Sequence, residues 1–319
     1  MSGTRSASEV RADIDPDRFT VHRATVADGL DLAYVREGVG GFPILLLHGY
    51  PETKRIWWRN IDALVDAGFE VIVPDLRGFG DSDLAPDGFY DAAVMAHDVR
   101  TLVHDVLGHE RCATASGDLG GVVAQDLSLR WPGFVRKQCI FNTVLPILPD
   151  AYAAARVAPD PDREHRPTAD YFIRQGADAE GLIAELDTPA RRRAYIAEFY
   201  GHRLWAAPGS FGPEDIAFMT EPFADGDTLR ASWGAYEGAT GKRELSETPR
   251  LFETNPVPTL ALYGPEDHVV WPNFAAKCAV AFPECIGPFV VPGAGHFLQW
   301  EQAGVLNRAL AHFFASEIA

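Results

Sequence analysis

The sequence has little of what would point to a metal-binding or disulfide-stabilised protein. Only four of its 319 residues are cysteines, and no two of them form a C-x-x-C pair. A zinc site of that type and a disulfide framework are therefore not expected. Cys112, Cys139 and Cys278 fall in stretches that resemble strand or helix, which favours buried free thiols. This cysteine usage predicts a reducing, cytoplasmic setting.

Long apolar runs and an excess of positive charge are also absent. No apolar run reaches the roughly 18 residues that a transmembrane helix needs. Residues 1–18 are polar and charged and lack the apolar core of a secretory signal. The chain has 28 Lys and Arg against 45 Asp and Glu, a net charge of -17. Such a surface repels phosphate backbones and anionic lipids, so neither nucleic acid nor a membrane is an expected partner.

The sequence does contain a regular alternation of short apolar runs and helical stretches. Continuous apolar runs are typical of strands buried on both faces of a parallel sheet. The fold class expected is α/β, with a mostly parallel central sheet flanked by helices. A hairpin is predicted at 19–36, further strands at 43–47, 70–74, 111–115, 137–142, 259–263 and 288–291, and helices at 57–67, 91–107, 122–130 and 305–316.

This alternation stops between about residues 145 and 250. The intervening segment is helical and loop-like and is rich in proline and aromatic residues. The simplest organisation is a parallel sheet interrupted by a helical insert. We therefore expect a flexible tail at 1–18, a first core part at 19–145, a helical domain at 146–250, and a second core part at 251–319.

The segment 115–122 (ASGDLGGV) lies where a strand should give way to a helix. A nucleophile at such a turn needs small residues two positions before and after it. Asp118 has Ser116 and Gly120 in those places, whereas Ser116 itself would be more crowded, and no G-x-S-x-G motif occurs. The turn alone leaves a second interpretation open, in which Asp118 only caps the following helix.

Four further segments follow predicted strands, where parallel sheets place their functional sites. They are 48–51 (HGYP), 74–82 (PDLRGFGDS), 263–267 (YGPED) and 293–297 (GAGHF). A nucleophile, an acid and a histidine thus occur in the chain order of α/β-hydrolases.

On these five motifs, the chain from about Thr20 onward resembles the epoxide hydrolase and haloalkane dehalogenase group of the α/β-hydrolase superfamily. The resemblance implies an α/β-hydrolase fold whose helical insert is a cap domain, with no metal or organic cofactor. It implies that Asp118 is the nucleophile and that His296 is the base. Asp267, rather than its neighbour Glu266, would orient that base, and the backbone N–H groups of Tyr50 and Leu119 would form an oxyanion hole.

An aspartate nucleophile predicts a different substrate from a serine. A carboxylate suits attack on a saturated carbon that carries a strained or good leaving group. The product would be an alkyl ester on Asp118, and water activated by His296 would then hydrolyse it.

The leaving group is indicated by the residues around the nucleophile. Haloalkane dehalogenases typically have a halide-binding Trp after the nucleophile and often an Asn after His-Gly, whereas this sequence has Leu119 and Tyr50. Fluoroacetate dehalogenases have an Arg in the first of these places. The HGYP segment instead resembles the H-G-x-P of epoxide hydrolases, which also use cap tyrosines to protonate the epoxide oxygen. Tyr236, in 229–236 (LRASWGAY), resembles the later of these tyrosines.

The earlier ring-opening residue is less well defined. Tyr171 lies in the expected region, although Thr168 is nearer the expected place, and the substitutes considered are Tyr152, His165 and Tyr200. Candidate pocket residues are Trp57, Phe172, Trp205, Phe218 and Trp233.

The expected function is hydrolysis of an epoxide to a vicinal diol, with a small hydrophobic organic substrate and a monomeric or homodimeric enzyme. The alternatives are a haloalkane or haloacid dehalogenase with an atypical halide site, and a non-catalytic ligand-binding protein of the same fold.

Overall fold

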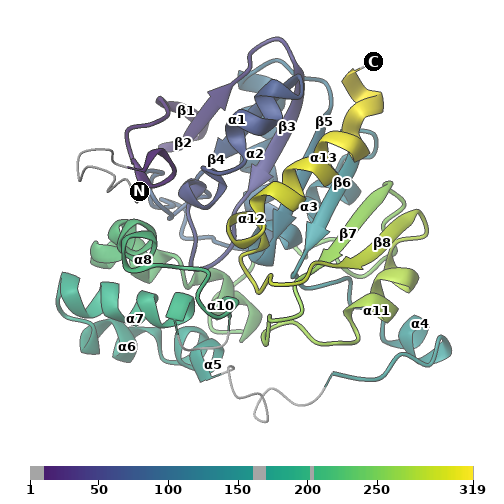
Figure 1. Ribbon diagram of the computed structural model, residues 1–319. Coiled ribbons are helices and arrows are strands. Elements are labelled where there is room, and N and C mark those ends of the chain that lie inside the picture. Colours follow the sequence, from purple (N-terminus) through teal and green to yellow (C-terminus); the bar gives the residue numbers. More distant parts are fainter. Residues whose placement is uncertain (1–10, 161–169, 202–204, 319) are drawn as a thin grey trace, which may run out of the picture.

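An eight-stranded sheet forms the centre of the computed structural model, which describes residues 11–160, 170–201 and 205–318 (Figure 1). The strand order is β1-β2-β4-β3-β5-β6-β7-β8. The first two strands pair antiparallel, β2 pairs antiparallel with β4, and all later neighbours are parallel. The strands are β1 (Val21–Ala27), β2 (Leu30–Glu37), β3 (Phe42–Leu47), β4 (Phe69–Pro74), β5 (Cys112–Gly117), β6 (Val135–Phe141), β7 (Thr259–Tyr263) and β8 (Cys285–Val290).

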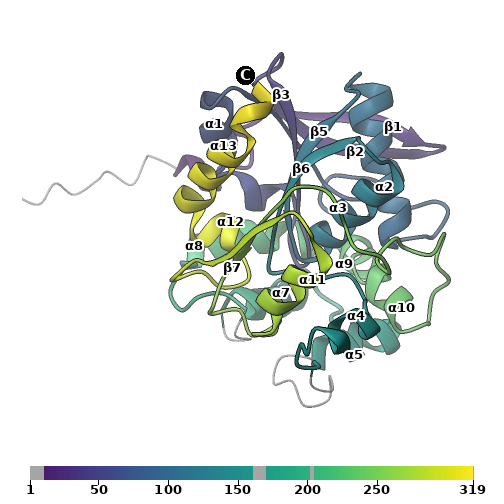
Figure 2. The same cartoon turned by 90° about the vertical axis from the view of Figure 1, so that its right-hand side faces the viewer.

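Helices cover both faces of this sheet, as Figure 2 shows. On one face lie α1 (Ile61–Asp66) and α13 (Ala303–Ile318), and on the other lie α2 (Ala92–Arg100) and α3 (Asp118–Arg130). Because both faces are covered, β4 and β5 are buried along their whole length. This is the burial expected of parallel strands in α/β proteins, and it confirms the predicted fold class.

Strands β3 to β8 all run in one direction, so their carboxyl ends meet at one edge of the sheet. Each of the five sequence motifs follows one of these strands. The central strand β5 leads directly into α3 at Asp118. Residues far apart in the sequence are therefore brought together around the end of β5.

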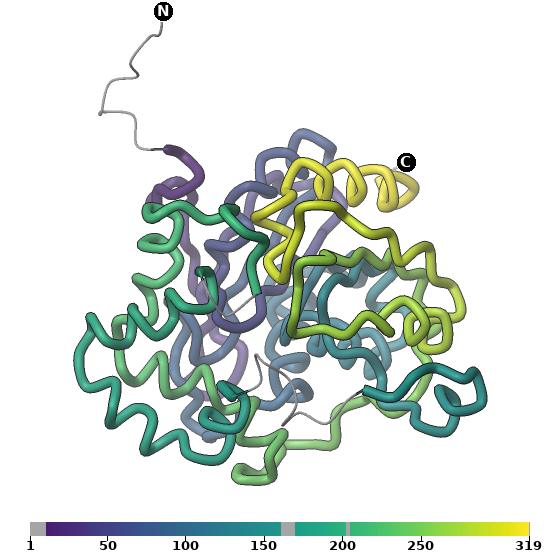
Figure 3. The backbone as a smooth tube through the Cα atoms, turned by 60° about the horizontal axis from the view of Figure 1, so that its bottom comes forward, coloured from purple at the N-terminus to yellow at the C-terminus, as the bar shows by residue number. Residues whose placement is uncertain are grey.

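Between β6 and β7 the chain leaves the sheet and forms a helical insertion, defined here as residues 142–258. Helices α5 to α10 gather beside the carboxyl edge of the sheet, while α4 packs separately against α11 (Phe274–Ala281) (Figures 1 and 3). The helices of the insertion are α4 (Pro149–Ala154), α5 (Asp170–Ala177), α6 (Ala179–Glu185), α7 (Pro189–Gly201), α8 (Pro213–Thr220), α9 (Gly226–Ala231) and α10 (Gly234–Ala239).

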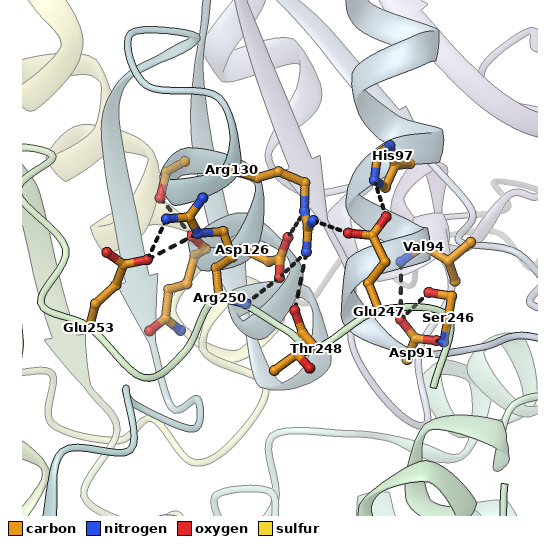
Figure 4. A network of polar contacts seen from close by, with 12 residues as sticks. Asp91, Val94, His97, Asp126, Arg130, Ser246, Glu247, Thr248, Arg250 and Glu253 are labelled. Atoms are coloured by element: carbon orange, nitrogen blue, oxygen red, sulfur yellow. Dashed lines mark hydrogen bonds and ion pairs between the residues drawn. The ribbon is translucent and has the colours of Figure 1, made fainter. Parts of the chain in front are cut away.

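Hydrogen bonds and ion pairs connect the end of the helical insertion to α2 and α3, as Figure 4 shows. The buried carboxylate of Asp126 on α3 accepts a hydrogen bond from the N–H of Arg250 (2.7 Å) and pairs with Arg130 (2.7 Å). Asp91, the N-cap of α2, accepts hydrogen bonds from the N–H (2.7 Å) and Oγ (2.8 Å) of Ser246. The returning chain is thereby held against the helix that begins at Asp118.

Most predicted elements are confirmed, with boundaries shifted by a few residues. The hairpin, the six further strands and the helix near the C-terminus all form. The helix predicted at 57–67 is split into a 3-10 turn at Lys54–Trp57 and α1, and the one at 91–107 into α2 and a π-helix at Thr101–Val106. Two helices, α11 and α12 (Leu298–Glu301), were not predicted. Neither is long enough to show a clear helical period.

Residues 1–10 lie outside the described residues, but part of the expected tail is placed. The segment 11–18 lies against the core, where the indole Nε1 of Trp58 donates to the carbonyl of Asp15 (3.0 Å) and Arg59 pairs with Asp13 (2.8 Å). These partners lie far away in the sequence, so nothing in the segment itself signals them. Within the described residues, no helix is both long and apolar enough to cross a bilayer.

Candidate active site

The turn at Asp118 has the geometry of a nucleophile elbow. Asp118 adopts a φ of 42°, in the left-handed region that residues other than glycine rarely occupy. A Cβ at Gly120 would come within 2.6 Å of the carbonyl oxygens of Leu47 and His48, so only glycine fits there. Ser116, the alternative nucleophile, is buried within β5. The small residue predicted two positions after Asp118 is thus required by a steric limit.

The side chain of Asp118 does not cap α3. The N-cap position is Gly117, and no side-chain cap hydrogen bond forms there. Instead Oδ1 of Asp118 accepts a hydrogen bond from the backbone N–H of Tyr50 (2.8 Å). The loop after β3 lies so close to Asp118 that a Cβ at Gly49 would be 2.4 Å from the Cβ of Asp118. The N–H of Leu119 is in the first turn of α3, where backbone donors have no acceptor within the helix.

The other carboxylate oxygen of Asp118 faces His296. Nε2 of His296 lies 3.2 Å from Oδ2 of Asp118, without an aligned hydrogen bond. Nδ1 of His296 lies 2.9 Å from Oδ2 of Asp267. The second oxygen of Asp267 accepts from the N–H groups of Val269 (2.7 Å) and Val270 (3.3 Å), so its position is fixed. Glu266, the alternative acid, is exposed.

Two buried groups at the site, His296 and Glu52, have pKa values above their usual ones. Burial by itself lowers the pKa of His296, but the negative charges of Asp267 and Asp118 outweigh it, and the pKa lies well above its usual value. Burial raises the pKa of Glu52, which lies just beyond the HGYP segment, to about 7. One oxygen of Glu52 accepts from the N–H of Gly49 (2.6 Å) and the other from Gln299 (2.9 Å). Glu52 therefore fixes the loop that carries Tyr50.

Two positioning residues were missed at the sequence level. Asn142, directly after β6, accepts from the N–H of Gly264 (2.9 Å) and donates to the carbonyl of Gly295 (2.5 Å). It thus joins the loop of Asp267 to the loop of His296, and its own carbonyl accepts from the N–H of Asp118 (3.1 Å). The available signal was a polar residue at the carboxyl end of a buried strand. Glu52 gave a weaker signal, as an acid directly after the HGYP segment.

A cavity of about 810 Å³ opens beside Asp118, between the sheet edge and the helical insertion. Asp118 and Leu119 form part of its wall, and Tyr171, Phe172 and Tyr236 line it from the insertion. Its other charged lining groups are already paired: Asp91 with Ser246, and Asp160 with Lys277. Asp118 differs from these groups because its partners are the N–H of Tyr50 at Oδ1 and the ring of His296 at Oδ2.

The two predicted tyrosines lie together over this cavity. The rings of Tyr171 and Tyr236 have centroids 5.7 Å apart, and Tyr171 also packs on Trp205 at 4.9 Å. Burial, together with the hydroxyl of Tyr171 and the charge of Asp118, raises the pKa of Tyr236 well above its usual value. Tyr236 is therefore held in its protonated, proton-donating form.

The substitute tyrosines are already engaged with backbone groups. The hydroxyl of Tyr152 donates to the carbonyl of Pro146 (2.6 Å), and that of Tyr200 donates to the carbonyl of Pro51 (2.5 Å). Thr168 and His165 lie outside the described residues.

The five predicted pocket residues divide into two groups. Phe172 lines the cavity beside Asp118. The other four pack elsewhere in the described core: Trp57 against Phe141, Trp205 against His296, Phe218 against Trp58 and Trp300, and Trp233 against Tyr195. The sequence signal of large aromatic residues does not separate a cavity wall from plain core.

Among residues 11–160, 170–201 and 205–318, no three or more His, Cys, Asp or Glu side chains are grouped so that they could hold a metal ion. What the sheet edge does assemble is a strained aspartate, a buried histidine and a second carboxylate, on the loops after β5, β8 and β7. The chain belongs to the α/β-hydrolase family, whose profile, described as alpha/beta hydrolase fold, matches residues 43–303.

Individual relatives place the chain further within this family. It is 42% identical over 300 residues to a soluble epoxide hydrolase of Corynebacterium sp. strain C12, across 92% of this chain and 97% of that protein. A haloalkane dehalogenase of Bradyrhizobium diazoefficiens is 28% identical over 319 residues, across 94% of this chain and 96% of that protein. The solved structure of the epoxide hydrolase CorEH without ligand superposes with a TM-score of 0.79 at 25% identity, covering 93% of this chain and 99% of that one. The chain is thus a hydrolase of the epoxide hydrolase-like group.

Proposed function

We propose that this enzyme hydrolyses an epoxide to a vicinal diol and that Asp118 is its nucleophile. One observation carries the proposal. The Asp118 carboxylate has one oxygen on the N–H of Tyr50 and the other beside His296, and the cavity it faces is also lined by Tyr171 and Tyr236. A nucleophile and two hydroxyl donors thus share one apolar cavity. That combination suits a substrate that is attacked at carbon while its oxygen is protonated.

In the first step, Oδ2 of Asp118 forms a bond to an epoxide carbon and the ring C–O bond breaks. Oδ1 is held by the N–H of Tyr50, so Oδ2 is the oxygen left for attack. The developing alkoxide takes a proton from Tyr236 or Tyr171. The product is an alkyl ester of Asp118 and a tyrosinate, with no charge lost overall.

In the second step, water attacks the carbonyl carbon of that ester. His296 takes one proton from the water, and the N–H groups of Tyr50 and Leu119 stabilise the negative charge that develops on Oδ1. When the C–O bond to the diol breaks, protonated His296 returns that proton to the leaving oxygen. The carboxylic acid so formed at Asp118 loses its proton, which restores the tyrosine.

The charges of the site explain why His296 can act only in this second step. In the free enzyme, Asp118 and Asp267 together raise the pKa of His296. Ester formation removes the charge of Asp118, so the pKa of His296 falls and the imidazolium releases its proton to solvent, which gives the neutral, water-activating form. His296 takes a proton back from solvent once Asp118 is ionised again. Asp267 remains ionised and holds the ring in place through Nδ1.

The helical insertion would act as a cap, because it supplies the two tyrosines and one wall of the cavity. We also propose that the substrate is a small hydrophobic organic molecule, since the other charged side chains around the cavity already have protein partners: Asp91 accepts hydrogen bonds from Ser246, and Asp160 pairs with Lys277. The buried thiols of Cys112, Cys139 and Cys278 suit a cytoplasmic enzyme. We propose that the enzyme is a monomer or a homodimer.

A single-turnover reaction in oxygen-18 water tests the mechanism. With enzyme in excess over epoxide, the diol should carry no label, because its new oxygen comes from Asp118, and the label should appear on the Asp118 peptide. A labelled diol in the first turnover would mean direct attack by water and would refute the covalent scheme. Parallel incubation with a haloalkane panel covers dehalogenation: halide release without any diol from epoxides would reverse the assignment.

A further inference from the structure

The side chain of Tyr50 has a role that is separate from its backbone N–H. Tyr50 is fully buried in the loop after β3. Its hydroxyl accepts a hydrogen bond from Nε2 of Gln175 (2.6 Å) and another from Nε1 of Trp233 (3.2 Å). Both partners belong to the helical insertion, whereas the backbone of Tyr50 contacts Asp118. One residue therefore connects the candidate nucleophile with the insertion.

The two partners of this hydroxyl are next to the two candidate ring-opening tyrosines. Gln175 lies on α5 one helical turn after Tyr171, so the two side chains share a helix face. Trp233 is the N-cap residue of α10, three positions before Tyr236. The ring of Tyr50 also packs edge-on against that of Tyr236, with centroids 5.3 Å apart.

The hydrogen bonds of the Tyr50 hydroxyl are buried, so breaking one would leave a polar group without a partner away from water. Gln175 and Trp233 are fully buried, and Nε2 of Gln175 also donates to the hydroxyl of Tyr195 on α7 (2.8 Å). Oε1 of Gln175 is buried without a hydrogen-bond partner among the described residues. In the opposite amide orientation, Oε1 would accept from the hydroxyl of Tyr50, so the pairing does not depend on that assignment. Buried polar groups of this kind specify one arrangement of their surroundings.

We propose that the hydroxyl of Tyr50 is a positioning group that sets α5 and α10, and with them Tyr171 and Tyr236, relative to Asp118. The inference rests on the proposed function. It assigns the hydroxyl to ring opening only, because ester hydrolysis uses the backbone N–H of Tyr50 together with His296. Small displacements of catalytic groups cost large factors in rate, so loss of this link should slow one chemical step and spare the other.

The test is Tyr50→Phe, which keeps the ring and the backbone N–H and removes only the hydroxyl. Rapid-quench mass spectrometry measures the formation of the alkyl-enzyme and its decay separately. We expect formation to slow about tenfold or more and decay to stay within about twofold of wild type. The matched control is Tyr90→Phe, which removes another buried tyrosine hydroxyl, one that bonds the N–H of Ala85 (3.0 Å); it should change neither rate.

A second variant keeps the test decisive if Tyr50→Phe folds poorly. Gln175→Leu removes the shortest of the hydroxyl's contacts from the other side and should slow formation alone. In the double variant the two effects should be strongly non-additive, because both remove the same link. Formation at the wild-type rate in Tyr50→Phe, equal slowing of both steps, or additive effects would each overturn the proposal. If the wild-type enzyme forms no alkyl-enzyme from any epoxide, the proposed function fails and this inference fails with it. If the wild type forms the alkyl-enzyme but the variants behave as just described, only this inference fails.

Discussion

The sheet edge and the helical insertion contribute to the same cavity but are built in different ways. At the sheet edge, Asp118, Asp267 and His296 follow three parallel strands, of which β5 and β7 are buried and β8 is at the exposed edge of the sheet. Backbone hydrogen bonds and Asn142 fix these loops to one another. In the insertion, Tyr171 and Tyr236 stand on helices of eight and six residues. These helices are held mainly by side-chain contacts.

The difference teaches which part of the site is tied to the fold and which part can vary. A nucleophile at the end of a central strand cannot move without disturbing the core. Short helices have little stability of their own and take their position from what they pack against. We therefore expect substitutions at the sheet edge to lower turnover most, and substitutions in the insertion to have smaller effects that are confined to ring opening.

The largest effect is expected at Asp118. Asp118→Ala removes the nucleophile and should lower epoxide turnover by about 10⁴-fold or more, while circular dichroism and the unfolding midpoint stay close to wild type. The matched control is Ser116→Ala, since Ser116 is the other nucleophile considered and is buried in β5. Turnover that survives in Asp118→Ala but is lost in Ser116→Ala would reverse the roles of the two residues.

The next largest effect is expected at His296. His296→Gln should still form the ester but hydrolyse it about 10³-fold more slowly, the usual contribution of a general base. The intact mass of the protein should then rise by one substrate and stay there. As a control, His97→Gln changes an exposed histidine that pairs with Glu247 (3.0 Å) and should leave no adduct. Rapid, complete release of diol by His296→Gln would show that the base is another group.

A smaller effect, confined to one step, is expected in the insertion. Tyr236→Phe should slow ester formation about 10²-fold and leave ester hydrolysis unchanged, because the hydroxyl donates only during ring opening. Tyr171→Phe should act in the same direction. In Tyr200→Phe, which removes a hydroxyl already committed to Pro51, ester formation should fall far less. Equal slowing of both steps by Tyr236→Phe would assign Tyr236 to the structure of the cavity instead.

Prediction from sequence succeeded best where local signals coincide with the strand ends. Strand β3 is a continuous apolar run, and the small residue at position 120 reflects the steric limit seen at Gly120. For this reason the fold class and the turn at Asp118 could be identified without coordinates. The family resemblance supplied the order of the motifs and the choice of Asp267 over Glu266.

Prediction was weakest where contacts join segments that are distant in the sequence. Nothing near Gln175 or Trp233 indicates that both bond the hydroxyl of Tyr50, and nothing near Asn142 indicates that it joins two loops. Trp57 and Phe172 are both large and aromatic, yet of the two only Phe172 lines the cavity. Such placements depend on how helices pack, which the periodicity of a single segment does not report.

The smallest effect concerns Glu301, which lies where the two regions meet. Its carboxylate accepts hydrogen bonds from the N–H of Gly295, next to His296, and from the N–H of Ala207 in the insertion (2.8 Å). Burial raises the pKa of Glu301 to about 7, from 4.5 in an exposed carboxyl. The folded protein therefore binds the proton more tightly than the unfolded chain does. Proton binding by Glu301 therefore contributes to the free energy of unfolding. This contribution is complete below pH 4.5 and is lost as the pH rises through about 7.

Glu301→Gln removes this titration, so the two proteins should diverge with pH. The free energy of unfolding of wild type relative to Glu301→Gln should fall between pH 5 and pH 8 by on the order of 2 kcal/mol, measured by urea denaturation. Glu253→Gln is the matched control, because Glu253 pairs with Arg250 at the surface (2.8 Å) and is half exposed; its difference from wild type should stay nearly constant. Parallel stability curves for wild type and Glu301→Gln would mean that the protonation of Glu301 contributes nothing to the free energy of unfolding over this pH range.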